Sequence, residues 1–389
     1  MTDRLPPRIF WPDSVSRPVA TPLHMSVVYA SGSPDELDDQ YEGRASGHTY
    51  SREGHPNASV LATRIAALEN SPTPGWVTGS GMAAVTAVMM ALLEKDDRIL
   101  GGDQLYGRSL RLMAEELPRL GFRTSLADPT NGEAFAAAIT PDTRIVLIEA
   151  VSNPTLRVAD VEPIAKAAHA NGALLVVDNT FTTPAGFQPF EHGADIVIHS
   201  VTKLLAGHSD AMLGWFAARD PALQKRLEVT AITLGLTPSP FDCWLAERGI
   251  HTFGLRQERA ESNAAALAER LATLPGVTRV VYPGRSDHPD RDRAMTLLAG
   301  SGNMVSFELS GGRDAANQFV RAMPDIPFAP TLGDVSTTLS HPASSSHRGL
   351  TAEGRLALGI TEGFFRVSVG IEPVGELLGS FERAVRSIR

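Results

Sequence analysis

The chain has 389 residues, of which 43% are hydrophobic and 20% charged, so two domains or one large one with an ample core are expected. Its 35 Lys and Arg against 44 Asp and Glu give a net charge of −9, which argues against nucleic acid as a partner because phosphate binding needs clustered basic residues. The single cysteine, Cys243, excludes an intramolecular disulfide and a cysteine-based metal cluster, and its apolar helical surroundings predict a buried thiol.

The first 55 residues are rich in Pro, Gly, Ser and Asp and show little periodicity. We expect residues 1–55 to form an extended arm that packs on a neighbouring subunit. The opening MTDRLPPRIFWPDSVSRP lacks the apolar region of a signal peptide. The longest apolar stretch, residues 83–93, is shorter than the roughly 20 residues that a membrane span needs. No membrane partner is therefore expected, and the protein is predicted to be cytoplasmic.

Helices and strands alternate in the next part of the chain. Amphipathic helices are predicted over residues 59–70 and 81–97, and after them apolar strands alternate with helices. The expected strands are 97–102, 122–127, 144–154, 173–180 and 195–200, and the expected helices are 109–121, 132–139 and 160–172. This alternation predicts an α/β fold with a mostly parallel sheet between layers of helices.

The pattern changes from about Pro238 onward. Long helical segments, including residues 243–274, are followed by strands over 303–309 and 364–370. We therefore expect a large domain over residues 56–245 and a smaller α+β domain over residues 246–389.

Polar residues gather at the ends of three successive predicted strands. Glu149, Ser152 and Asn153 follow one strand, Asp178, Asn179 and Thr180 follow the next, and Ser200, Thr202 and Lys203 follow the third. Because ligands of parallel α/β sheets bind beyond the carboxyl ends of the strands, these side chains predict one shared site.

The residue types at this edge point to a particular cofactor. Lys203 is either a solvated surface residue or a nucleophile, since a partly desolvated lysine has a lowered pKa and forms Schiff bases. A Gly-Ser-Gly turn opens the helix at Gly81, and a helix N-terminus is suited to a phosphate. Asp178 is placed to hold a ring nitrogen protonated, and Ser200 and Thr202 offer further donors to a phosphate. Together these are what pyridoxal phosphate requires.

Other ligand classes have less support. The segment GSGMAA also fits a dinucleotide-binding turn, but the preceding SPTPGWVT is a poor strand. LLVVD resembles a Walker-B strand, yet the chain has no Gly-x-x-x-x-Gly-Lys-Ser/Thr motif. The eleven histidines show no metal-ligand spacing, so no metal site is predicted.

Several motifs in their order resemble a known family. YSREGHPN, SGMAA, LYG, SNPTLRVADV, VVDNTF, HSVTKLLAGHSD, TLGDVSTTLSHPASSSH and RVSVGIEP are similar to the Cys/Met-metabolism enzymes that use pyridoxal phosphate. This group includes cystathionine γ-lyase, cystathionine γ-synthase, methionine γ-lyase and the O-acylhomoserine sulfhydrylases. The resemblance runs from about residue 20 to the end and implies the aspartate aminotransferase-like fold of type I transferases.

The resemblance also implies roles for individual residues. Lys203 would hold the cofactor covalently and carry protons, and Tyr106 would stack on its ring and assist proton transfer. Arg366 would grip the substrate carboxylate, for which its planar fork is suited. The remaining implied cofactor contacts are Gly81, Met82, Ser200 and Thr202 to the phosphate, Asp178 to the pyridine nitrogen, Asn153 to the ring hydroxyl, and Tyr50 and Arg52 to the phosphate of a neighbouring subunit.

The resemblance therefore implies an obligate homodimer within a homotetramer. It also implies a carbon–sulfur lyase that releases a thiol, ammonia and a 2-oxo acid from a small amino-acid substrate by γ- or β-elimination. The alternatives are γ-replacement, a tailoring enzyme for an unusual γ-substituted amino acid, and a non-catalytic homologue.

Some positions depart from the family pattern. His55-Pro56-Asn57 stands where Asn-Pro-Thr is usual, and Thr331 replaces a serine beside the substrate. Arg108 follows LYG, where a small residue or cysteine is common, and would either bind a distal substrate carboxylate or point to solvent. Ser336 stands where cystathionine-processing members often have a glutamate, so this segment looks more like that of methionine γ-lyases and sulfhydrylases.

Overall fold

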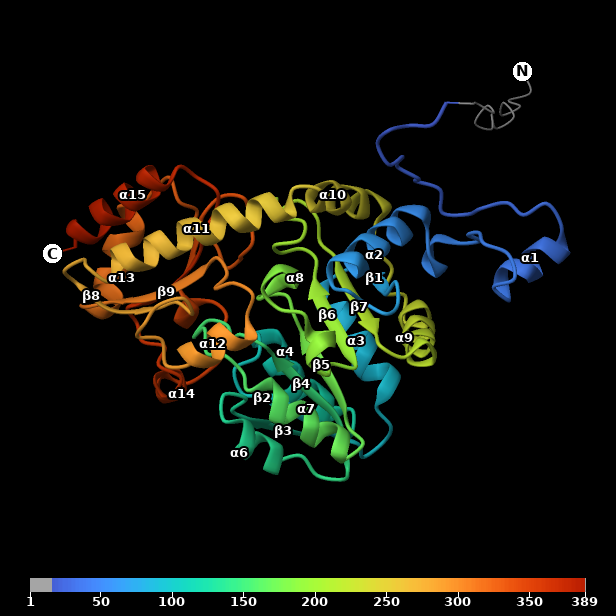
Figure 1. Ribbon diagram of the computed structural model, residues 1–389, viewed down its shortest axis with the longest axis horizontal. Coiled ribbons are helices and arrows are strands. Elements are labelled where there is room, and N and C mark those ends of the chain that lie inside the picture. The colour runs from blue at the N-terminus through green and yellow to red at the C-terminus, as the bar shows by residue number, and fades with distance from the viewer. Residues whose placement is uncertain (1–15, 389) are drawn as a thin grey trace, which may run out of the picture.

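The computed structural model describes residues 16–388. Residues 1–15 of the predicted arm lie outside the described residues. The rest of that stretch contains α1 (Pro34–Tyr41) and an isolated bridge between Val28 and Tyr50, and most of its side chains are exposed. In Figure 1 this segment and α1 lie apart from both sheets of the molecule.

A seven-stranded sheet forms the larger part of the structure, in the order β1-β7-β6-β5-β4-β2-β3. The pairs from β6 to β3 are parallel, whereas β7 runs antiparallel to both of its neighbours. The strands are β1 (Trp76–Thr78), β2 (Arg98–Gly102), β3 (Arg123–Ala127), β4 (Thr143–Glu149), β5 (Leu174–Asp178), β6 (Ile196–Ser200) and β7 (Gly214–Ala218).

Helices cover both faces of this sheet because alternate residues of each central strand point to opposite sides. In β4, Val146 and Ile148 join one buried cluster, and Ile145 and Leu147 join the other. The helices of this part are α2 (Pro56–Leu68), α3 (Gly81–Leu92), α4 (Gly107–Arg111) continued by a π-helical turn (Leu112–Glu116) and α5 (Leu117–Arg119), α6 (Gly132–Ala137), α7 (Val161–Ala170), α8 (Thr183–Gly186), α9 (Pro221–Thr233) and α10 (Pro240–Ile250). The predicted mostly parallel α/β sheet is confirmed.

Two details of the sheet differ from the expectations. The segment judged a poor strand does contain β1, a three-residue strand at the edge of the sheet. It forms because Gly75 turns the chain against Trp215 and β1 then pairs with β7. The strand β7 is likewise not among the strands that the sequence predicts. The dinucleotide-binding arrangement is nevertheless absent from the described sheet, since β1 and β2 are not neighbours.

A second sheet of four antiparallel strands lies toward the C-terminus, in the order β10-β11-β9-β8. Phe307, Phe319, Phe365 and Phe381 pack together in its core, with Phe307 stacked on Phe365 and edge-on to Phe319 and Phe381. Figure 1 shows α11, α13 and α15 gathered around this sheet at one end of the molecule. Its elements are β8 (Val277–Val281), β9 (Met304–Leu309), β10 (Thr338–Ser340), β11 (Phe364–Ser368), α11 (Phe253–Leu271), α12 (Arg291–Leu297), α13 (Gly312–Arg321), α14 (Ala352–Ala357) and α15 (Val374–Arg386).

The segment 243–274 forms two helices, because the chain turns at His251 and Thr252 between α10 and α11. The predicted domain boundary at residue 245 lies within α10. Cys243 is fully buried there, and burial raises the pKa of its thiol. Among the described residues, none of the helices has the length and hydrophobicity to cross a bilayer.

Candidate active site

Lys203 lies in the turn that follows β6 and faces a cavity of about 1270 Å³. Its Nζ donates to Thr331 Oγ1 at 3.4 Å, a contact between the two parts of the chain. Burial, and then the nearby positive charge of Arg366, lower the pKa of Lys203. A larger fraction of the amine is therefore neutral, and hence nucleophilic, at a given pH than for an exposed lysine.

Asp178 ends β5, the neighbour of β6, and lines the same cavity. Its Oδ1 accepts a hydrogen bond from the Thr180 backbone N–H at 3.0 Å. Burial raises the pKa of Asp178, and the hydrogen bonds from Thr180, followed by the electrostatic interaction with His199, oppose this only in part. Within residues 16–388 no lysine or arginine forms an ion pair with this carboxylate. A protonated ring nitrogen of a bound ligand could therefore supply the cationic partner.

The N-terminus of α3 closes the cavity beside Ser200. The Ser80 side chain caps this helix by accepting from Ala83 N at 3.1 Å. A Cβ atom placed on Gly81 would lie 2.6 Å from Ser200 Cβ, so only glycine lets the helix terminus approach this closely. The first N–H groups of the helix and the Ser200 hydroxyl therefore share one edge of the cavity. The Thr202 hydroxyl lies beside them but donates to Leu213 O at 3.1 Å.

Arg366 comes from β11 of the other sheet and is only 5% exposed. Its Nη1 donates to Asn153 Oδ1 at 2.6 Å and its Nη2 to the Thr331 carbonyl oxygen at 2.7 Å. The Nε group is buried without a partner in the described part of the chain. Burial lowers the pKa of Arg366 to about 10. An anion in the cavity would compensate this buried charge.

Tyr106 precedes α4, and its side chain is 41% exposed at the cavity wall. Its backbone N–H donates to Glu149 Oε1 at 2.6 Å. Burial, and then the negative charge of Asp178, raise the pKa of Glu149 well above its ordinary value. Glu149 therefore positions the start of α4. The sequence predicted only that Glu149 is one of the polar residues at the strand ends, and not this role.

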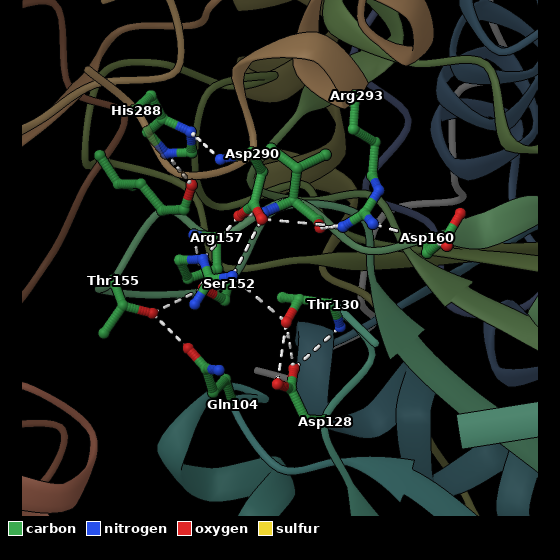
Figure 2. A network of polar contacts seen from close by, with 12 residues as sticks. Gln104, Asp128, Thr130, Ser152, Thr155, Arg157, Asp160, His288, Asp290 and Arg293 are labelled. Atoms are coloured by element: carbon green, nitrogen blue, oxygen red, sulfur yellow. Dashed lines mark hydrogen bonds and ion pairs between the residues drawn. The ribbon is translucent and has the colours of Figure 1, made fainter. Parts of the chain in front are cut away.

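The loop that carries Asn153 is held by a polar network between the two parts of the chain, shown in Figure 2. Asp290 accepts hydrogen bonds from Arg157 Nε at 2.6 Å, Arg157 Nη2 at 2.9 Å and Val158 N at 3.0 Å. His288 Nε2 contacts Leu156 O at 3.0 Å. This network fixes the loop shortly after Asn153 and so supports the contact between Asn153 and Arg366.

Most of the predicted site residues line this one cavity. They are Gly81, Met82, Tyr106, Arg108, Asn153, Asp178, Ser200, Thr202, Lys203, Thr331 and Arg366. Tyr50 and Arg52 do not line it; both are exposed, with the Arg52 guanidinium 5.1 Å from the centre of the Tyr50 ring.

The departure at His55-Pro56-Asn57 has a local structural explanation. His55 caps α2, since its Nδ1 accepts from Ala58 N at 3.2 Å and its Nε2 contacts Pro238 O at 3.3 Å. Asn57 holds the preceding segment through His24 N and Pro22 O, both at 2.9 Å. These residues therefore join α2 to its neighbours and do not line the cavity.

These residues fit pyridoxal phosphate: a helix terminus for the phosphate, a carboxylate that has no Lys or Arg partner in the described part of the chain for the ring nitrogen, and a lysine of lowered pKa for the aldehyde. Residues 11–386 match the model of the family described as Cys/Met metabolism PLP-dependent enzyme. The chain belongs to this family. The predicted cofactor and fold are thereby confirmed, and the protein is a pyridoxal-phosphate enzyme of sulfur amino-acid metabolism.

The chain is similar to individual members of the family over most of its length. It is 39% identical to cystathionine beta-lyase MetC of Bacillus subtilis (strain 168) over 341 residues, which are 88% of this chain and 87% of the relative. It is also 39% identical to the cystathionine gamma-lyase of the same organism over 346 residues, 89% and 90% of the two chains. The crystal structure of cystathionine gamma synthase from Xanthomonas oryzae pv. oryzae in complex with cystathionine matches with a TM-score of 0.88 and 36% identity, covering 95% of this chain and 93% of that one.

Proposed function

We propose that this enzyme catalyses α,γ-elimination from a sulfur amino acid of the cystathionine or methionine type, releasing a thiol, ammonia and a 2-oxo acid. The observation that carries the proposal is that Lys203, Asp178 and Arg366 line a single cavity. The similarity to two cystathionine lyases favours elimination, with α,β-elimination as the closely related outcome.

Arg366 binds the α-carboxylate of the substrate. Asn153 and the Thr331 carbonyl hold its two Nη atoms, and so the guanidinium is oriented before the substrate arrives. The substrate carboxylate would offset the buried positive charge of Arg366. Because this guanidinium is already removed from water in the free enzyme, binding does not have to desolvate it. The Asn153 carbonyl oxygen accepts from Arg366, which leaves its amide N–H groups to reach the ring hydroxyl of the cofactor.

Lys203 would hold the cofactor by its aldehyde, and its amine would also move the proton at the α-carbon of the substrate. Its lowered pKa favours this role, because the amine releases its own proton more readily than that of an exposed lysine. Tyr106, at the wall of the same cavity, assists proton transfer to the leaving group. When bound, pyridoxal phosphate supplies the electron sink that stabilises negative charge at the α-carbon. The remaining proposed contacts to the cofactor are Asp178 at the ring nitrogen and Gly81, Met82, Ser200 and Thr202 at the phosphate.

We also propose that the active unit is a homodimer, assembled further into a homotetramer in the cytoplasm. Tyr50 and Arg52 are exposed and do not line the cavity of their own chain, as expected if they complete the site of a neighbouring subunit. Exposed apolar residues of the same segment, Met25, Val27 and Val28, would be covered by that contact.

The substrate panel that tests this function contains cystathionine, methionine, homocysteine and an O-acylhomoserine, each with and without an added thiol. We expect ammonia and a 2-oxo acid to form from a thioether substrate without added thiol. Formation of a thioether from the O-acylhomoserine only when thiol is present would establish γ-replacement instead, the activity named for the Xanthomonas oryzae neighbour. Turnover of none of these substrates by cofactor-loaded protein would overturn the proposal.

A further inference from the structure

The turn of residues 201–207, which follows β6 and carries Lys203, is bound by a side chain of α11. Arg256 Nη1 donates to Leu204 O at 2.9 Å, and Arg256 Nη2 donates to Leu205 O at 3.0 Å. These two carbonyls belong to the residues that directly follow Lys203. One guanidinium group therefore holds the backbone of this turn at two successive positions.

Arg256 is buried, and all three of its side-chain nitrogens donate hydrogen bonds. The residue is 7% exposed, its Nη2 also donates to Gly249 O at 3.1 Å, and its Nε donates to Thr252 Oγ1 at 3.2 Å. Among the described residues no carboxylate lies within ion-pair distance of it. Burial lowers the pKa of Arg256, and the charge of Asp334 opposes this only in part. Apolar packing would often stabilise such a junction equally well, so the guanidinium is better explained by the backbone positions that it fixes.

Gly207, at the end of the turn, leaves the space that the guanidinium occupies. Its φ is 75°, a conformation that favours glycine, and a Cβ atom placed on it would overlap the guanidinium of Arg256. Its N–H donates to Lys203 O at 2.8 Å, and its carbonyl oxygen accepts from Val335 N at 2.8 Å. The hydrogen bond that closes the turn on Lys203 therefore lies directly beside Arg256.

The loop between α13 and β10 also contacts this turn, but it holds the Lys203 side chain less firmly. A Cβ atom placed on Gly333 would lie 2.5 Å from Leu204 N, so the two backbones touch there. The contact from Lys203 Nζ to Thr331 Oγ1 is 3.4 Å, which is long for a hydrogen bond. The two bonds from Arg256 to the turn have ordinary lengths, so they fix the backbone from which Lys203 extends.

We propose that Arg256 is a positioning residue for Lys203, which fixes the turn so that the lysine amine keeps its place in the cavity. This inference rests on the proposed function, in which Lys203 holds the cofactor. Arg256 does not line the cavity, so it acts through the backbone of the turn and not on the substrate. A lysine cannot replace it fully, because one ammonium group does not reproduce a planar fork that binds several carbonyls.

Arg256→Lys and Arg256→Met test this inference in protein loaded with pyridoxal phosphate, after far-UV circular dichroism has confirmed the fold. The main measurement is the visible circular dichroism of the bound cofactor without substrate. Free pyridoxal phosphate is achiral, so this band reports how firmly the protein orients it. We expect a weaker band in both variants, with more of it retained in Arg256→Lys. A displaced amine should also lower kcat about ten- to a hundredfold. KM should stay nearly unchanged, because Arg366 still binds the substrate carboxylate.

Arg285→Lys is the matched control. The Arg285 side chain is 12% exposed and also contacts α11, through Glu269 at 3.0 Å, but it does not line the cavity. Its band and its kcat should equal those of the unsubstituted enzyme.

An unchanged band in folded Arg256 variants, or an equal loss in Arg285→Lys, overturns the positioning role. Loss of the fold in both Arg256 variants also overturns it, since Arg256 would then be a structural residue; if only Arg256→Met fails to fold, Arg256→Lys decides. Loaded protein that shows the band but converts no sulfur amino acid overturns the proposed reaction, while the band still tests Arg256 without substrate.

Discussion

Asp290 gives the sharpest test of the network that joins the two parts of the chain. Its side chain is 7% exposed and accepts three hydrogen bonds, two from Arg157 and one from Val158 N. Asp290→Asn removes the charge and turns an amide N–H toward these donors. Breaking a buried ion pair costs about 3–5 kcal/mol, but Arg157 is 33% exposed and regains water, so we expect a loss of about 2–3 kcal/mol.

The assay is the thermal midpoint of the purified variant. At roughly 2.1 cal/mol/K per residue, 389 residues give an unfolding entropy of about 0.8 kcal/mol/K, so Tm should fall by about 3 °C. The matched control is Asp287→Asn, since Asp287 pairs with Arg285 at 2.9 Å but is 59% exposed; its Tm should change by less than about 1 °C. Equal effects of the two substitutions would refute the reasoning.

The pH dependence of Asp290→Asn follows from the sign of its pKa shift. Burial opposes ionisation of Asp290, but the hydrogen bonds from Arg157 and Val158 outweigh it and hold the pKa below its ordinary value. The stabilisation is therefore complete above the ordinary aspartate pKa of about 3.9 and is lost as pH falls through the lower folded value. The difference in Tm between the native chain and Asp290→Asn should accordingly disappear only in acid. A difference that vanished near neutral pH would contradict this assignment.

Two further predictions concern single residues. Arg366→Lys should raise KM for the amino-acid substrate more than about tenfold in steady-state kinetics, because one ammonium group cannot reproduce the bonds to Asn153 and Thr331; an unchanged KM would show that Arg366 does not hold the substrate. Cys243 should resist a thiol reagent in the folded protein and react fully in denaturant, since burial both covers the thiol and raises its pKa; rapid labelling without denaturant would be inconsistent with the structure.

Local sequence signals predicted much of the fold. The strands from β2 to β6 and the helices from α4 to α7 could be recognised because each is a continuous apolar run or an amphipathic stretch bounded by polar residues, whereas the short α8 lies in a segment expected to be a loop. β1 and β7 were missed because a short strand such as Trp76–Thr78 is stabilised by pairing with a segment far along the chain. The turn between α10 and α11 was missed for a related reason, since helical periodicity continues across His251 and Thr252 while the axis changes direction.

The residues of the candidate site also fall into those that the sequence could place and those that it could not. Asp178 and Lys203 could be placed together from strand ends alone, because neighbouring parallel strands deliver their carboxyl ends to one edge. Arg366 comes from the other sheet, and only the resemblance to the family assigned it to the same site as Asn153; the hydrogen bond between these two residues, 213 positions apart, was not predicted. The bond between Glu149 and Tyr106 N and the network around Asp290 had no sequence signal, since they depend on how loops meet in space.

The most direct test of the account is the chemical location of the cofactor. The chain has four lysines, and Lys95, Lys166 and Lys225 are exposed, whereas Lys203 faces the cavity. Protein loaded with pyridoxal phosphate would be reduced with borohydride, which fixes the cofactor to the lysine that holds it, and then mapped by mass spectrometry. We expect the label on Lys203 and its absence in Lys203→Ala. Label on an exposed lysine alone, or an unlabelled chain, would contradict the central role of Lys203.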